Sequence, residues 1–107
     1  MAEKMEHSAL TEAVYYILLS LYKPMHGYGI MQNIKELSNG RVSLGAGTMY
    51  GAINTLLEKG WIHPVAVTEE KSRKKEYQIT EVGKEIIKLE LLRLNELIKN
   101  GDDIAGG

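Results

Sequence analysis

Two adjoining stretches of the chain carry side chains that could do chemistry. Four of the thirteen basic residues fall within five positions, at Lys71, Arg73, Lys74 and Lys75. Shortly before them, small or hydrogen-bonding residues without charge gather in one short segment, at Gly47, Thr48, Tyr50, Gly51, Asn54 and Thr55. Basic groups neutralise phosphates, and small polar side chains can approach base edges in a major groove. A basic loop alone is often only a solvated surface, and it is the uncharged segment beside it that favours binding to nucleic acid.

These two stretches are placed by a predicted helix over 46–59 and a predicted β-hairpin after it. The apolar residues of the helix form one stripe, made of Met49, Ile53, Leu56 and Leu57. This leaves the small polar residues on the other face. Gly60 ends the helix, where a positive φ is favoured. Two extended runs, 61–67 and 76–80, flank a polar tip at 68–75 that holds the basic residues. The pattern predicts a mainly α protein with a small β-hairpin (α+β), folded as a winged helix-turn-helix.

A second helix is predicted after the break at Lys23 and Pro24, running to about residue 37. Its inward-facing residues are predicted to be Ile30, Ile34 and Leu37. At its start, Tyr28 either offers its hydroxyl to a phosphate or packs with the core. Residues 41–44 are predicted to add a short third strand beside the hairpin.

The helices at the two ends of the chain carry more apolar surface than one small domain covers. The first, over 8–22, is apolar on nearly all sides, which is typical of a helix buried on more than one side. The last runs from the N-cap Thr80 to about residue 99, with apolar residues at coiled-coil spacing. Either each helix lies on its own domain, or the last helix of one subunit packs on the first helix of another, and we favour the dimer. The expected interface residues are Leu10, Tyr15, Leu19, Ile87, Leu91, Leu94 and Ile98.

Length and composition limit the remaining possibilities. The 107 residues are divided into a winged helix-turn-helix domain over 1–80, a dimerisation helix over 81–100 and a flexible tail over 101–107. The net charge of −1 argues against a protein that coats nucleic acid through bulk charge. There is no cysteine, which excludes disulfides and thiolate chemistry. We see no signal segment, and the apolar run at 13–21 is too short to cross a bilayer, so we expect a cytoplasmic protein.

An enzyme is not favoured. The three histidines, His7, His26 and His63, lie on separate predicted elements. No Ser-His-Asp order, phosphate loop or carboxylate pair occurs in a usable context. The sequence therefore predicts no catalytic residue, no metal site and no cofactor.

Five segments spread over nearly the whole chain form a recognisable set. In order they are LSL at 19–21, HGYG at 26–29, GTMY at 47–50, LLEKGWI at 56–62 and RKKEYQITEVG at 73–83. Together, in this order and spacing, they resemble the PadR family of transcriptional regulators. The resemblance implies a winged-helix fold and a homodimer built by the terminal helices. It also implies repression by binding a palindromic operator in double-stranded DNA, often relieved by a small aromatic or cationic ligand.

The resemblance also implies which residues contact DNA. The segment 47–50 lies where family members insert the start of their recognition helix, so Thr48 and Tyr50 are the best contact candidates with Gly47 beside them. Asn54 follows one turn later, and its amide could pair with adenine. The wing-tip residues expected at phosphate or the minor groove are Lys71, Arg73 and Lys74. Gly45 and Ala46 replace a common Ser-Pro, and Gly51 replaces a common proline, so a cap hydroxyl is missing and the helix is weakened.

The sequence supports a ligand-binding site less strongly than it supports DNA binding. The last helix has no aromatic residue, and Trp61 at the foot of the hairpin is more typical of a core residue than of a ligand platform. Tyr15, Tyr16 and Tyr22 on the first helix could line an interfacial pocket instead. The alternative function is a winged-helix module that binds protein and has no sequence-specific DNA binding.

Overall fold

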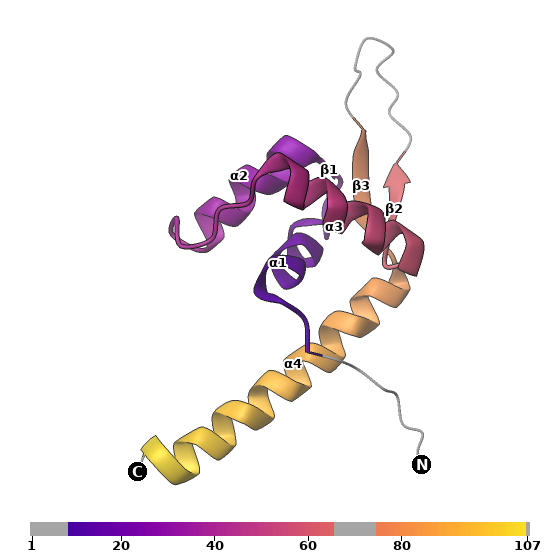
Figure 1. Ribbon diagram of the computed structural model, residues 1–107. Helices are drawn as coiled ribbons and strands as arrows, with labels where there is room; N and C mark the ends of the chain where they lie inside the picture. The colour runs from indigo at the N-terminus through magenta and orange to yellow at the C-terminus, as the bar shows by residue number, and fades with distance from the viewer. Residues whose placement is uncertain (1–8, 66–74, 107) are drawn as a thin grey trace.

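The computed structural model describes residues 9–65 and 75–106, and the chain is mainly helical with one small antiparallel sheet, as predicted (Figure 1). In chain order the elements are α1 (Glu12–Ser20), β1 (Met25–His26), α2 (Gly27–Leu37), α3 (Ala46–Lys59), β2 (Ile62–Val65), β3 (Glu76–Ile79), α4 (Glu81–Gly101) and the π-helical turn η1 (Asp102–Gly106). The predicted bounds of α3 are confirmed, because Gly60 adopts a left-handed φ of 76° and its N–H closes the last turn.

The sheet has three antiparallel strands in the order β1-β3-β2. In the central strand, Tyr77 lies opposite Met25 of β1, and Ile79 lies opposite Ile62 of β2. Tyr77 and Ile79 are both buried, as the alternation in the sequence predicts. The sheet therefore presents one face to the helices.

The predicted third strand at 41–44 is wrong. The edge of β3 that β2 leaves open is occupied by the segment that follows α1. Ile79 fastens this segment, because its N–H donates to the carbonyl oxygen of Leu21 at 2.8 Å. Strand β1 follows directly and completes the sheet.

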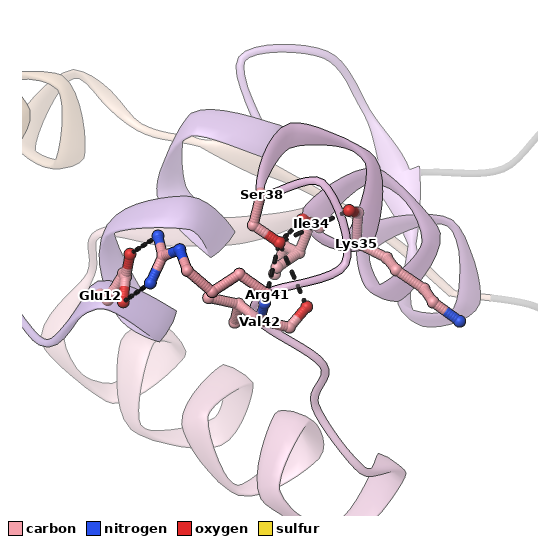
Figure 2. A network of polar contacts seen from close by, with 6 residues as sticks. All are labelled: Glu12, Ile34, Lys35, Ser38, Arg41 and Val42. Carbon is pink, nitrogen blue, oxygen red and sulfur yellow. Dashed lines mark hydrogen bonds and ion pairs between the residues drawn. The ribbon is translucent and has the colours of Figure 1, made fainter.

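Residues 38–42 fold back against the neighbouring helices instead (Figure 2). The Ser38 hydroxyl donates to the carbonyl of Ile34 and accepts the N–H of Val42, both at 2.9 Å. The Arg41 guanidinium donates two hydrogen bonds to the Glu12 carboxylate of α1. These contacts leave the backbone of 41–44 away from the sheet.

One core joins the helices to the sheet. Its buried apolar residues are Ile17, Leu18, Leu21, Ile30, Ile34, Met49, Ile53, Leu56, Ile62, Tyr77, Ile79 and Ile87. The prediction that Leu37 faces inward is wrong. Leu37 is 50% exposed, because it is the last residue of α2, where the helix ends.

The terminal helices differ in length from the predictions. Helix α1 begins at Glu12 rather than residue 8, because the Thr11 hydroxyl caps it by accepting the N–H of Val14 at 3.1 Å. Thr80 caps α4 as predicted, since its hydroxyl accepts the N–H of Gly83. Helical backbone continues through α4 and η1 over 101–106, where we expected a flexible tail.

Only the first part of α4 packs on the body of the protein. Gly83 lies against the carbonyl group of Trp61, and Ile87 is 3% exposed. Farther along, α4 projects away from the other elements (Figure 1). Its exposed apolar residues there are Leu91, Leu92, Leu97 and Ile98.

Candidate nucleic-acid interface

The outer face of α3 carries small and polar residues and no charge before Glu58. The core holds the opposite side of the helix, so the predicted contact residues and their neighbours are exposed: Gly47, Thr48, Tyr50, Gly51, Asn54 and Thr55. A Cβ atom placed on Gly47 or Gly51 would meet no atom within 4 Å. The face therefore allows close approach and offers an amide and hydroxyl groups for hydrogen bonds.

Tyr50 lies at the edge of this face and is 46% exposed. Its hydroxyl and ring carbon lie against the backbone of Gly27, in the space that a side chain there would fill. The pKa of buried Tyr77 is raised, first by burial and second by the nearby Tyr50. Tyr50 thus joins α3 to the start of α2 and to the sheet while part of its ring stays open to solvent.

Tyr28 lies in the first turn of α2 and is 61% exposed, so it is not a core residue. Its hydroxyl accepts a hydrogen bond from the Gln32 amide at 3.0 Å. His26 caps the same helix, because its Nδ1 accepts the N–H of Gly29 at 3.1 Å. The His26 and Tyr28 rings stack with their centres 6.5 Å apart.

The hairpin of β2 and β3, called the wing here, contacts the end of α3 through β2. The basic tip residues Lys71, Arg73 and Lys74 lie outside the described residues, so their role stays a prediction. Lys75, at the start of the described arm, is exposed.

The residues predicted for the dimer interface fall into three groups by burial. Leu10, Tyr15, Leu19 and Leu94 are partly buried, and Leu91 and Ile98 are 43% and 60% exposed. Ile87 shares their stripe but is buried in the core of its own chain. The exposed part of the stripe therefore begins one turn later than the sequence pattern suggests.

Two of the three tyrosines that could line an interfacial pocket border a cavity within the single chain, and their role in ligand binding stays a prediction. Tyr15 and Tyr16 border a cavity of about 270 Å³ between α1 and α4. Burial raises the pKa of Tyr15, with Glu90 as the second cause. Tyr22 is not among the residues that line this cavity, and the Lys84 ammonium lies over its ring at 5.6 Å.

Glu90 is a buried polar residue that the sequence analysis missed. It is 2% exposed, and its carboxylate accepts hydrogen bonds from Arg93 at 3.0 and 2.6 Å. Its position three residues after Ile87 and three before Arg93 was the available signal, because this spacing places all three on adjoining faces of one helix.

Residues 15–89 match the transcriptional regulator PadR-like family. The chain belongs to this family. The match begins in α1 and ends in α4, so it includes both helices of the helix-turn-helix and the wing. PadR-like proteins are transcriptional regulators, and this PadR-like chain has their winged-helix fold.

Solved PadR structures share the arrangement. PadR of Bacillus subtilis in complex with operator DNA is 28% identical, with a TM-score of 0.64, over 75% of this chain and 46% of that chain. A PadR family transcription regulator from Clostridium difficile R20291 is 23% identical, with a TM-score of 0.73, over 87% of this chain and 97% of that one. The second likeness concerns the fold alone.

A curated relative also matches this PadR-like chain in part. It is an uncharacterized 37.1 kDa protein in transposon TN4556 of Streptomyces fradiae, 37% identical over 67 residues. The match spans 63% of this chain and 18% of that protein.

Within residues 9–65 and 75–106, no helix is both long and apolar enough to cross a membrane. The same residues contain no group of three His, Cys, Asp or Glu side chains that could hold a metal ion.

Proposed function

We propose that the protein is a dimeric repressor that binds a palindromic operator in double-stranded DNA. The observation that carries this proposal is the outer face of α3, which is exposed, small and uncharged over 47–55. It belongs to a fold whose solved examples include a PadR in complex with operator DNA. In the proposal, α3 enters the major groove and the wing lies along the adjacent backbone.

Base contacts come from the outer face of α3. The Asn54 amide pairs with N6 and N7 of an adenine, and the Thr48 hydroxyl donates to or accepts from a neighbouring base edge. Gly47 and Gly51 have open space around them, which lets the helix backbone approach the groove floor. Tyr50 contributes its exposed edge one turn before Asn54.

Phosphate contacts come from the wing and the start of α2. Lys71, Arg73 and Lys74 neutralise phosphates, which releases counterions and makes binding salt-dependent. The exposed hydroxyl of Tyr28 adds a contact beside the N-terminus of α2. These contacts position α3 and carry no sequence information of their own.

Dimerisation uses the exposed apolar stripe of α4. Leu91 and Ile98 lie on a helix that projects from the body, where a single copy leaves them in water (Figure 1). Burying each such side chain contributes about 1.5–3 kcal/mol, which offsets the cost of association. A two-fold dimer places two α3 helices about 34 Å apart, which matches a palindrome with half-sites one turn apart.

Release of the operator by a small aromatic effector is the remaining part of the proposal. The cavity bordered by Tyr15 and Tyr16 supports it, because the cavity lies between α1 and α4, the two helices expected at the dimer interface. As a regulator of transcription the protein acts where its DNA is, in the cytoplasm.

Selection from a pool of random DNA duplexes tests this function. We expect enrichment of a palindromic sequence whose binding, measured by fluorescence anisotropy, exceeds that of a scrambled duplex by about 10³-fold or more. Equal binding to every duplex would contradict the proposal. A protein partner for the outer face of α3 would then be the better explanation.

A further inference from the structure

Tyr50 is the one aromatic residue of α3, and the two ends of its side chain have different surroundings. The hydroxyl end lies against the buried backbone of Gly27, where a Cβ atom would lie 2.7 Å from the ring carbon that bears the hydroxyl. Burial raises the pKa of Tyr77, and the nearby Tyr50 raises it further, which agrees with a hydroxyl directed toward the sheet. The polar end of Tyr50 is therefore directed into the body of the protein.

The rest of the Tyr50 ring is open to solvent, because the side chain as a whole is 46% exposed. Gly47 lies one turn before it and Gly51 directly after it. A Cβ atom at either glycine would meet no atom within 4 Å, so both positions leave space beside the ring. The part of Tyr50 that faces outward is aromatic carbon, which is an apolar surface.

An apolar surface in the major groove has one matching group on the bases. Thymine presents its 5-methyl group there, whereas adenine, guanine and cytosine present hydrogen-bond donors and acceptors. Contact between the methyl group and aromatic carbon is favourable, because both surfaces leave water. A hydroxyl that lies against Gly27 is poorly placed to bond a base edge.

We propose that Tyr50 selects thymine in the operator through contact between its ring edge and the 5-methyl group. This inference rests on the proposed binding of α3 in the major groove. Asn54 follows Tyr50 by one turn, so the two side chains are neighbours about 5–6 Å apart. Base pairs stack about 3.4 Å apart, which places the thymine within about two base pairs of the adenine that Asn54 contacts.

Deoxyuridine tests the proposal without altering the protein, because it differs from thymidine only in lacking the 5-methyl group. Each thymine of the selected operator is replaced in turn, at symmetric positions of the two half-sites, and binding is measured by fluorescence anisotropy. We expect wild type to lose affinity about tenfold at one such position, because two methyl contacts are lost and each contributes about fourfold.

Three variants then show which part of the protein senses the methyl group. Tyr50→Ala removes the ring and binds the thymine and deoxyuridine operators equally. Tyr50→Phe removes only the hydroxyl and retains the tenfold difference between the two operators. Tyr28→Ala is the matched control, because Tyr28 is an exposed tyrosine proposed to contact a phosphate. It weakens both operators by the same factor and keeps the difference between them.

A sequence-specific operator that tolerates deoxyuridine at every position would overturn this proposal and leave the proposed DNA binding standing. A difference that persists in Tyr50→Ala would also overturn it, because the methyl group would then act through the DNA or another side chain. So would its loss in Tyr50→Phe, which would assign the contact to the hydroxyl. Absence of any sequence-specific operator would overturn both proposals. Circular dichroism checks that Tyr50→Ala folds, and wild type with Tyr50→Phe keeps the test decisive if it does not.

Discussion

The side chain of Tyr50 lies between the body of the protein and the outer face of α3, and its position depends on a single glycine. The hydroxyl occupies the space beside Gly27 that any larger residue would fill. Because Gly27 begins α2, the contact ties the orientation of α3 to the start of the preceding helix. In the proposed complex this contact sets how Tyr50 meets the DNA.

Gly27→Ala is expected to lower the free energy of unfolding by about 1–3 kcal/mol, because the new methyl group collides with Tyr50 and Met49 in a packed site. Gly51→Ala makes the same change on the open face of α3, where it raises the free energy of unfolding by about 0.5–1 kcal/mol. Urea denaturation followed by circular dichroism measures both. Changes of the same sign in the two variants would show that Gly27 does not provide the space for Tyr50.

At the residue scale, the sequence predicts the exposed face of α3 but not the burial of Glu90. The α3 face follows from helical periodicity within one short segment, which the chain carries locally. Burial of Glu90 depends on Arg93 and on the packing of α1 beside α4, and α1 lies far away in the sequence. The spacing of Glu90 and Arg93 indicates their ion pair, but no residue near Glu90 in the sequence indicates the packing of α1.

The segment between α2 and α3 is held by side chains rather than by a strand (Figure 2). Arg41 ties it to Glu12 of α1, and Ser38 closes the turn behind α2. The Arg41 hydrogen bond lowers the pKa of Glu12 below its ordinary value of 4.5. A carboxyl group with a lowered folded-state pKa stabilises the protein above its unfolded pKa, and this stabilisation is lost as pH falls through the folded value.

Wild type is therefore expected to resist urea better than Glu12→Gln at pH 7, with the difference shrinking as the pH falls below 4.5. The exposed ion pair makes this difference small. Glu36→Gln, on the exposed side of α2, serves as the control for the loss of one surface carboxylate. A pH-independent difference for Glu12→Gln would mean that the ion pair with Arg41 does not form in solution.

At the element scale, helix ends with their own local signals were predictable. Gly60 ends α3 and Thr80 starts α4, and both signals are properties of single residues. Strand β1 was missed because two residues are too few to show any periodicity. Its existence depends on pairing Met25 with Tyr77, which no local pattern encodes.

The whole molecule is asymmetric, because a packed winged helix carries one long helix that leaves the body (Figure 1). The apolar stripe of α4 is predicted by its spacing, but how much of it remains free depends on how α4 leaves the wing. Gly83 packs closely on the carbonyl of Trp61, and this contact directs Ile87 into the core of its own chain. Ile98, farther along, remains exposed on the surface that the proposed dimer would bury.

Ile98→Glu is expected to raise the dimer dissociation constant at least tenfold, because it removes apolar burial and places a charge in the interface. Leu37→Glu is the matched control, because Leu37 is equally large and 50% exposed on α2, away from the proposed interface. Sedimentation velocity over a range of concentrations measures both. A dimer that tolerates Ile98→Glu as well as Leu37→Glu would exclude this stripe of α4 from the interface.

Asn54→Ala tests whether the outer face of α3 contacts base edges. Wild type and the variant are each bound to the selected operator and to operators with single symmetric base-pair changes. Fluorescence anisotropy at several salt concentrations measures each affinity. We expect Asn54→Ala to weaken the selected operator by about 1–3 kcal/mol and to lose discrimination at one A·T pair in each half-site. The salt dependence of operator binding by Asn54→Ala stays that of wild type, because asparagine carries no charge. The control Asn100→Ala, at an exposed position of α4, binds the operator as wild type does. If Asn54→Ala discriminates among these operators as wild type does, α3 does not contact bases as proposed.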